Sequence, residues 1–266
     1  MNRMLVRVGA LRHKTFIRLF SGVAPYYLVN EYPKSGGTWL AQMLAAATGL
    51  PFRRNQPIRF EPSVSHGHFL NPLGLRNIVV LWRDPRDLIV SFYYHCYFVN
   101  EHGNTLLVKL MKERSGFADY SNIRANLPAF IRLLSDWPVS PSFNWPQFAR
   151  VWIDRPGTIQ TSYEALRRDT PTELTHVIHA LTGHSLDSAR VREVVAEFDF
   201  NRVKAKAGRN RPQGTEVSFV REGALGGWKQ HFTLDAETAL RECGYLSAMQ
   251  ALGYSDGGHP SLTEIR

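Results

Sequence analysis

A lysine stands just before a glycine pair in residues 32–39, whose sequence is YPKSGGTW. Where such a loop opens a helix, its backbone N–H groups converge in front of the helix dipole and bind a phosphate without a metal ion. Lys34 adds a mobile positive charge to that site. In the loop of nucleoside-triphosphate enzymes the lysine follows the second glycine and a hydroxyl then holds magnesium. The order seen here keeps the phosphate-binding chemistry and argues against an ATPase.

The flanks of this loop supply the elements that it needs. Residues 26–30 form a short apolar and aromatic run typical of a buried strand. Residues 38–47 are rich in helix-forming side chains until Gly49 and Pro51 end the pattern. Strand, loop and helix in this order place the amides of residues 35–38 at the amino end of a helix. We therefore expect a phosphate site, the simpler alternative being a tight turn between a core strand and a core helix.

A second strand-to-helix junction follows. Residues 77–82 form a second strand-like run that is apolar after Asn77, Arg83 comes directly after it, and an amphipathic stretch occupies residues 88–98. The carboxyl ends of parallel strands meet at one edge of a sheet, so Arg83 is expected beside the Lys34 loop. Ser91 comes about two helical turns after Arg83, where its hydroxyl can share a second phosphate with the guanidinium.

Residues 219–229 are rich in glycine and follow neither a helix nor a strand pattern. Such a segment can fold over a ligand, because glycines allow the backbone to approach closely. Arg221 and the amide of Gly223 would then be available to an anion. Alone, the segment is equally typical of a plain surface loop.

With these three segments in this order, the chain resembles the sulfotransferases that use 3′-phosphoadenosine 5′-phosphosulfate (PAPS), most closely the soluble cytosolic type, over residues 26–233. The first loop of that family reads Tyr-Pro-Lys-Ser-Gly-Thr-Thr-Trp and grips the 5′-phosphosulfate, and Gly37 departs from its first threonine. The family's third signature is Arg-Lys-Gly, in which Glu222 replaces the lysine here. Arg83 and Ser91 match the family's 3′-phosphate pair. The resemblance implies PAPS as the cofactor, 3′-phosphoadenosine 5′-phosphate (PAP) as its product, and these cofactor-binding residues: Lys34, Ser35, Gly36, Gly37, Thr38, Trp39, Arg83, Ser91, Tyr163, Phe200, Arg221, Glu222 and Gly223.

In-line transfer of a sulfuryl group to a hydroxyl or amine needs a base for the acceptor's proton, and histidine suits that role. The resemblance places the family's catalytic histidine shortly before the Arg83 strand. Residues 64–72 occupy that place, where His68 fits best by register and His66 is the alternative. Lys34 and the loop amides are expected to stabilise the leaving phosphate oxygen. No cysteine or carboxylate stands at ligand spacing from the two histidines, so we expect no metal.

Length and composition agree with this interpretation. The 266 residues predict a single α/β domain, with a P-loop-type central parallel β-sheet flanked by helices. The net charge of +9 suits an anionic cofactor, although nucleic-acid or membrane binding would account for the charge equally well. We expect no nucleic-acid partner. The two cysteines favour a reducing compartment, so the expected location is the cytoplasm.

The chain is expected to divide into three parts: a basic amphipathic segment at residues 1–22, a sulfotransferase domain at residues 23–255 and a tail at residues 256–266. The first part is expected to form a helix packed against the domain. Its alternative use is peripheral contact with an anionic membrane, because arginines and lysines are interspersed with apolar side chains there.

Residues 100–155 are predicted to build the acceptor pocket, with prolines, Pro128 among them, breaking short helical patterns. The acceptor implied by the resemblance is a small molecule, a lipid or a glycan, and the protein is expected to be a monomer or a homodimer. Two other functions stay open. A P-loop nucleotide or small-molecule kinase would need magnesium-holding carboxylates, and a basic polyanion-binding module would account for the charge alone.

Overall fold

The computed structural model describes residues 15–19, 21–22, 26–53, 61–209, 212–219 and 223–254. At its centre lies a parallel five-stranded sheet with the strand order β2-β3-β1-β4-β5. Its strands are β1 (Tyr26–Glu31), β2 (Phe52–Arg53), β3 (Ser63–Gly67), β4 (Ile78–Trp82) and β5 (Thr158–Ser162). The predicted α/β class with a central parallel sheet is confirmed.

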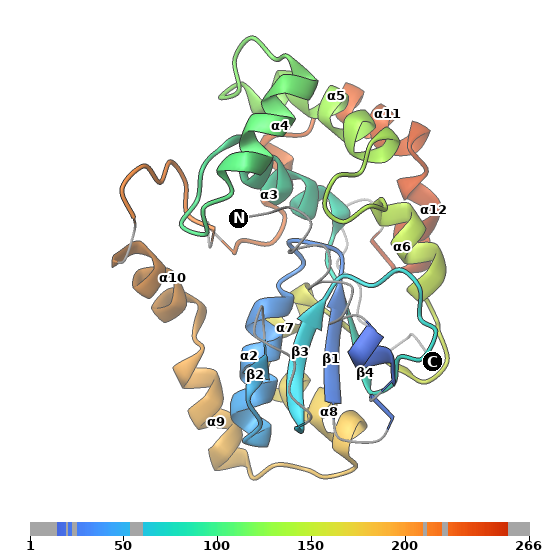
Figure 1. Ribbon diagram of the computed structural model, residues 1–266, viewed down its shortest axis with the longest axis vertical. Helices are drawn as coiled ribbons and strands as arrows, with labels where there is room; N and C mark the ends of the chain where they lie inside the picture. The colour runs from blue at the N-terminus through green and yellow to red at the C-terminus, as the bar shows by residue number, and fades with distance from the viewer. Residues whose placement is uncertain are drawn as a thin grey trace.

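Helices flank this sheet on both faces (Figure 1). They are α2 (Gly37–Thr48), α3 (Pro85–Tyr97), α4 (Thr105–Ser115), α5 (Ile123–Asp136), α6 (Trp145–Trp152), α7 (Tyr163–Arg168), α8 (Thr170–Thr182), α9 (Ser188–Glu197), α10 (Phe200–Arg209), α11 (Leu234–Glu242) and α12 (Tyr245–Ala251), with a 3₁₀ turn, η1 (Gly227–Gln230). In Figure 1, α4, α5, α6, α11 and α12 gather above and to the right of the sheet, while α9 and α10 lie to its left.

The alternation of side chains along β4 divides the core into two layers. Val79 and Leu81 point to the layer that contains the apolar residues of α2 and α8. Val80 and Trp82 point to the other face, where they join the buried aromatic residues of α3, α5 and α6. All five residues of β4 are apolar and buried, as expected for a central parallel strand that is covered on both faces.

The part of the amino-terminal segment that the structure describes packs on the domain. Ile17 is buried in the same core layer as Trp82, and the guanidinium of Arg18 donates a 2.7 Å hydrogen bond to the carbonyl of Asn71. Residues 1–14 lie outside the described residues, so membrane contact through them stays a prediction. Among the described helices, none is both long enough and apolar enough to cross a membrane.

The prediction that Pro128 breaks its helix is wrong. The proline lies inside α5, which continues past it to Asp136. Proline removes one hydrogen bond of a helix, but Leu127, Phe130 and Ile131 are buried around it. Tertiary packing of this apolar face therefore outweighs the local preference.

Candidate active site

The loop between β1 and α2 presents its backbone to a cavity. Lys34 and Gly36 both adopt left-handed backbone conformations, with φ of 76° and 100°. A Cβ atom on Gly36 would lie 2.7 Å from the ring of Tyr163, so only glycine fits there. No side chain at Gly36 caps α2, and the hydroxyl of Ser35 turns inward to donate to the carbonyl of Tyr32 at 2.8 Å. The amino end of α2 is thus shaped to receive an anion.

Arg83 reaches the same loop from the end of β4, as the sequence predicted. Its guanidinium donates a 2.8 Å hydrogen bond to the carbonyl of Lys34 and lies 4.5 Å from the centre of the Tyr163 ring. The Nε atom of Arg83 is buried and has no hydrogen-bond partner among the described residues. A buried donor of this kind is costly unless a ligand satisfies it, so Arg83 marks an anion site.

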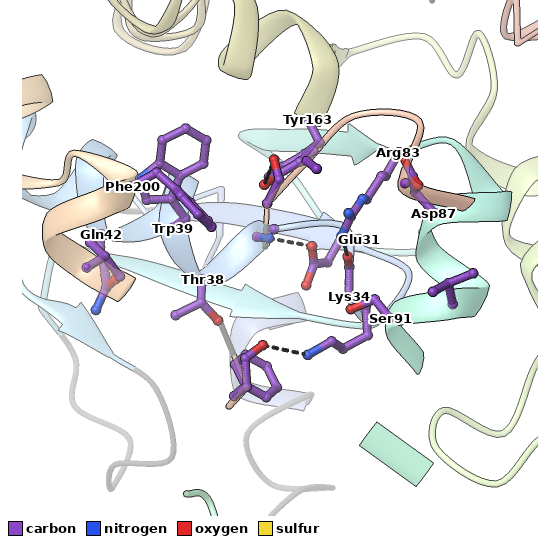
Figure 2. A pocket seen from close by; sticks show the side chains of 18 of the residues that line it. Glu31, Lys34, Thr38, Trp39, Gln42, Arg83, Asp87, Ser91, Tyr163 and Phe200 are labelled. Atoms are coloured by element: carbon purple, nitrogen blue, oxygen red, sulfur yellow. Dashed lines mark hydrogen bonds between the residues drawn. The ribbon is translucent and has the colours of Figure 1, made fainter. Parts of the chain in front are cut away.

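These groups surround one cavity of about 400 Å³. Figure 2 shows Lys34, Thr38, Arg83 and Ser91 around it. The structure brings together the following predicted cofactor residues on its walls: Lys34, Gly36, Gly37, Thr38, Trp39, Arg83, Ser91, Tyr163, Phe200 and Gly223. Ser35 lies within the loop with its side chain buried. Arg221 and Glu222 lie outside the described residues, so their predicted roles stay predictions.

Aromatic rings form one side of the cavity. The rings of Trp39 and Tyr163 meet edge to face with centroids 6.0 Å apart, and the indole N–H of Trp39 donates to the carbonyl of Phe198 at 2.8 Å. Gly223, with φ of 61°, packs so closely on Phe200 that a Cβ atom would lie 2.2 Å from the ring. Such a cluster of rings offers stacking faces for a flat heterocycle.

Described residues of the glycine-rich segment after α10 line the cavity, among them Phe219, Gly223 and Gly227. The ammonium group of Lys34 lies 3.2 Å from the centre of the Phe219 ring and donates to the carbonyl of the same residue at 3.4 Å. Asp87 accepts 2.8 Å hydrogen bonds from the amides of Gly226 and Trp228. A side chain of α3 therefore holds this segment beside the phosphate loop.

The two candidate histidines face different hydrogen-bond acceptors. The ring nitrogen that faces an acceptor must carry the proton, so these contacts determine the tautomer of each histidine. Nδ1 of His68 lies 2.9 Å from the backbone carbonyl of Glu31, which can only accept, so His68 carries its proton on Nδ1 and its lone pair on Nε2. Nε2 of His66 lies 2.8 Å from a carboxylate oxygen of Glu31, so that nitrogen is the protonated one. Among the described residues, the walls of the cavity include Glu31 and neither of these two histidines.

Glu31 is the site residue that the sequence analysis missed. Its side chain is 5% exposed; one carboxylate oxygen faces His66 and the other accepts the amide N–H of Gly37. Burial raises the pKa of Glu31, but the hydrogen bond from His66, the charges of His66 and His68 and the Gly37 amide together lower that pKa below its usual value. The feature of the sequence that could have identified Glu31 is its position at the end of β1, directly before the phosphate loop.

A carboxylate does lie beside the two candidate histidines, contrary to the expectation from the sequence. No carboxylate stands near the histidines in sequence, but parallel pairing of β1 with β3 brings Glu31 to them, because Val29 is opposite His66. One potential ligand atom from each of Glu31, His66 and His68 lies within 4.8 Å of the others. Spacing along the chain was a poor guide, since the sheet register sets this cluster.

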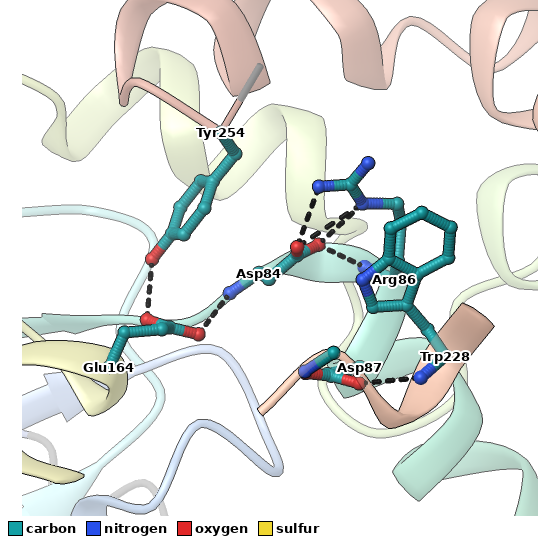
Figure 3. Close-up of polar contacts among 7 residues, drawn as sticks. Asp84, Arg86, Asp87, Glu164, Trp228 and Tyr254 are labelled. Carbon is teal, nitrogen blue, oxygen red and sulfur yellow. Dashed lines mark hydrogen bonds and ion pairs between the residues drawn. The ribbon is translucent and has the colours of Figure 1, made fainter. Parts of the chain in front are cut away.

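Behind Arg83, a buried network fixes the second junction (Figure 3). Asp84 is fully buried and pairs with the guanidinium of Arg86 at 2.7 Å. Glu164 accepts the amide N–H of Asp84 at 2.9 Å and the hydroxyl of Tyr254 at 3.0 Å. Burial is the main reason why the pKa of Glu164 rises to about 7, and the Asp84 amide and the charge of Arg83 oppose that rise.

Residues 62–252 match the sulfotransferase domain, and the chain belongs to this family. It is similar to the amine sulfotransferase of Oryctolagus cuniculus, with 25% identity over 247 residues, which cover 78% of this chain and 75% of the relative. It is also similar to sulfotransferase 1E1 of Homo sapiens, with 22% identity over 275 residues, which cover 85% of this chain and 86% of the relative.

Solved structures support the same fold. Mouse sulfotransferase SULT7A1, complexed with PAP, aligns with a TM-score of 0.58 and 17% identity over 85% of this chain and 84% of that one. Retinol dehydratase, in complex with androsterone and the inactive cofactor PAP, aligns with a TM-score of 0.52 and 14% identity over 90% and 84%. At this identity the likeness establishes the fold, and the site must be argued from the residues above.

Proposed function

We propose that the protein is a PAPS-dependent sulfotransferase that acts on a small-molecule acceptor. The observation that carries this proposal is the meeting of Lys34, the amino end of α2 and Arg83 on one cavity that also has an aromatic wall. Family membership and the PAP complexes of two proteins of similar fold support it. The unsatisfied Nε of Arg83 and the close approach of Gly223 to Phe200 fit a bound phosphate and a bound heterocycle.

Different residues would bind different parts of the cofactor. The amides of residues 36–38 and Lys34 would hold the 5′-phosphosulfate, Arg83 and Ser91 the 3′-phosphate, and Trp39, Tyr163 and Phe200 the adenine. When bound, PAPS supplies an activated sulfuryl group, whose bond to the phosphate oxygen breaks as a bond to the acceptor's oxygen or nitrogen forms. The ammonium group of Lys34 stabilises the charge that develops on the phosphate oxygen.

His68 is proposed as the base that takes the acceptor's proton. Its Nδ1–H donates to the Glu31 carbonyl, which fixes the ring and makes Nε2 the nitrogen that would take the proton. His66 stays the alternative, but its Nε2–H is directed at a carboxylate. Replacing each histidine by alanine separates the two: the base variant should lose transfer while PAP affinity stays within about threefold.

A kinase is the second candidate, because carboxylates do line the cavity. Both of those among the described lining residues are engaged within the protein, however: Asp87 accepts two backbone amides, and Glu31 faces His66 and Gly37. Neither is arranged as an open ligand for magnesium, so the arrangement favours sulfuryl transfer.

Radiolabelled PAPS decides between these functions. The protein is incubated with PAPS labelled with ³⁵S against a panel of phenols, alcohols and amines, with labelled ATP as the matched donor, each in magnesium and in EDTA. We expect transfer from PAPS that chelation leaves unchanged. Phosphoryl transfer from ATP that EDTA abolishes would establish the kinase instead, and salt-sensitive polyanion binding without transfer would establish the binding module. The acceptor's identity, the cytoplasmic location and the choice between monomer and homodimer stay predictions.

A further inference from the structure

The phosphate loop already holds a carboxylate from its own chain. Glu31 comes from the end of β1, and its buried side chain turns back to accept the amide N–H of Gly37 at the first position of α2. Figure 2 shows this hydrogen bond on the cavity wall next to Lys34 and Arg83. The N–H groups at the amino end of a helix are the groups that bind phosphate in such loops. An internal anion therefore occupies one of the donors that a phosphate would use.

The Glu31–His66 pair leaves no room for a side chain at position 37. A Cβ atom on Gly37 would lie 2.6 Å from Cδ of Glu31 and 2.7 Å from Cδ2 of His66. Real Cβ atoms do not come so close to other heavy atoms, so one of these side chains would have to move. The glycine at this position, where the resembled loop carries threonine, makes room for a buried carboxylate and its histidine.

The carboxylate is held in its charged form by the groups around it. His66 donates to one oxygen and the Gly37 amide to the other, and both contacts lower the pKa of Glu31. Lys34 and Arg83 also line the cavity, together with a second acidic residue, Asp87. An anion that approached the Gly37 amide would meet a negative charge at hydrogen-bond distance from the same donor, in a partly buried site where screening is weak.

We propose, on the basis of the PAPS site proposed above, that Glu31 competes with the 5′-phosphate for the Gly37 amide and so sets the affinity for the nucleotide. His66 is the partner that keeps the carboxylate when the phosphate takes the amide, because the Glu31–His66 hydrogen bond does not involve Gly37. Glu31 is thus a positioning residue that weakens nucleotide binding and speeds release of the PAP product.

Calorimetric titration with PAP tests this proposal with two variants that have opposite expected effects. Glu31→Gln keeps the size of the side chain but removes its charge and replaces one of its two acceptor oxygens with an NH₂ group, so PAP should bind about tenfold more tightly or better. His66→Asn removes the Nε2 donor and leaves Glu31 with the amide as its partner, so PAP should bind several-fold more weakly. His66→Gln, which keeps a donor near the Nε2 position, is the matched control and should lie close to the wild type.

The amide itself supplies a second readout. In ¹⁵N-labelled protein, the Gly37 resonance should differ between the wild type and Glu31→Gln before any ligand is added. Inorganic sulfate should shift that resonance at a lower concentration in Glu31→Gln. Thermal unfolding checks that each variant is folded; if Glu31→Gln is not, the His66→Asn and His66→Gln pair still decides.

The outcomes separate this inference from the proposed function. Failure of the wild type to bind PAP would contradict the proposed function, and the sulfate titration would still test Glu31. A folded Glu31→Gln that binds PAP equally or more weakly, or a His66→Asn with wild-type affinity, would show that the pair only supports the loop.

Discussion

The two strand-to-helix junctions of this protein have the same topology and opposite chemistry. At the end of β1, Gly36 gives α2 no side-chain cap, and the backbone passes through two left-handed residues. At the end of β4, Asp84 caps α3 by accepting the amide of Arg86, and Pro85 occupies the first turn. The first junction offers backbone amides to a ligand. At the second junction the Asp84 carboxylate already accepts the Arg86 amide, and Pro85 has no N–H.

This difference decides how each junction can bind a phosphate. The second junction offers only side chains, Arg83 at its start and Ser91 about two turns along α3. The first offers amides, which Glu31 covers in part. Position at the carboxyl edge of a parallel sheet is therefore not enough to make a phosphate loop; the capping residue determines whether the helix end is available.

The largest expected effect on stability comes from breaking the Asp84–Arg86 ion pair at the second junction. Asp84→Asn removes the charge that balances Arg86 and leaves a buried guanidinium unpaired, so the free energy of unfolding should fall by about 3–5 kcal/mol. Urea denaturation measures this loss. Asp84→Asn combined with Arg86→Met removes both charges and should recover part of it. A loss below about 1 kcal/mol in the single variant would show that the Asp84–Arg86 ion pair adds little to the stability of this junction.

At the first junction, Lys34→Ala should leave folding intact and reduce the rate of sulfuryl transfer by about 10²–10³-fold, because the charge on the leaving oxygen loses its cation. Single-turnover rates with a saturating acceptor from the panel measure the effect. Lys34→Arg keeps the charge and should retain more activity than the alanine variant. Unchanged turnover in Lys34→Ala would exclude a role for this lysine in the chemical step.

The pH dependence of stability tests the burial of the second junction. The pKa of Glu164 is about 7 when folded, against an ordinary 4.5, so the folded protein holds a proton that the unfolded chain releases between these values. Stability from this group is present below pH 4.5 and is lost as pH rises to 7. Relative to Glu164→Gln, the wild type should lose about 2–3 kcal/mol between pH 5 and pH 8. Parallel pH profiles of the two proteins would contradict this assignment.

The smallest of these effects is expected at Arg83. Arg83→Ala should weaken PAP binding by about 10–100-fold, because charge-assisted hydrogen bonds to the 3′-phosphate are lost, and should leave AMP binding nearly unchanged. Competition binding with both nucleotides measures the ratio. Ser91→Ala, which removes one neutral donor, should show the same selectivity change at a smaller size. An equal loss for both nucleotides would place Arg83 elsewhere on the ligand.

Local patterns in the sequence predicted the parts of the site that lie next to one another in the chain. The β1–α2 loop and the β4–α3 junction are each a strand, a turn and a helix within about 20 residues. Hydrophobic periodicity and the positions of the glycines were therefore sufficient to predict both junctions. The position of Arg83 beside Lys34 followed from the rule for parallel strands, and its hydrogen bond to the Lys34 carbonyl confirms it.

What the sequence did not reveal depends on register and packing. Glu31 meets His66 only because β1 and β3 pair with Val29 opposite His66, a fact that no short window contains. Helix α5 continues past Pro128 because burial of its apolar face outweighs the hydrogen bond that proline removes. The cap at Asp84 could have been predicted, since aspartate followed by proline is a typical helix start.

Calorimetric titration of the wild-type protein with PAP, AMP and ATP, in EDTA, is the decisive test of the PAPS site. We predict saturable binding of PAP, clearly tighter than binding of AMP, with no requirement for a metal, because the amides of α2 and Arg83 hold separate phosphates. Equal affinity for PAP and AMP, or nucleotide binding that appears only with magnesium and ATP, would contradict it.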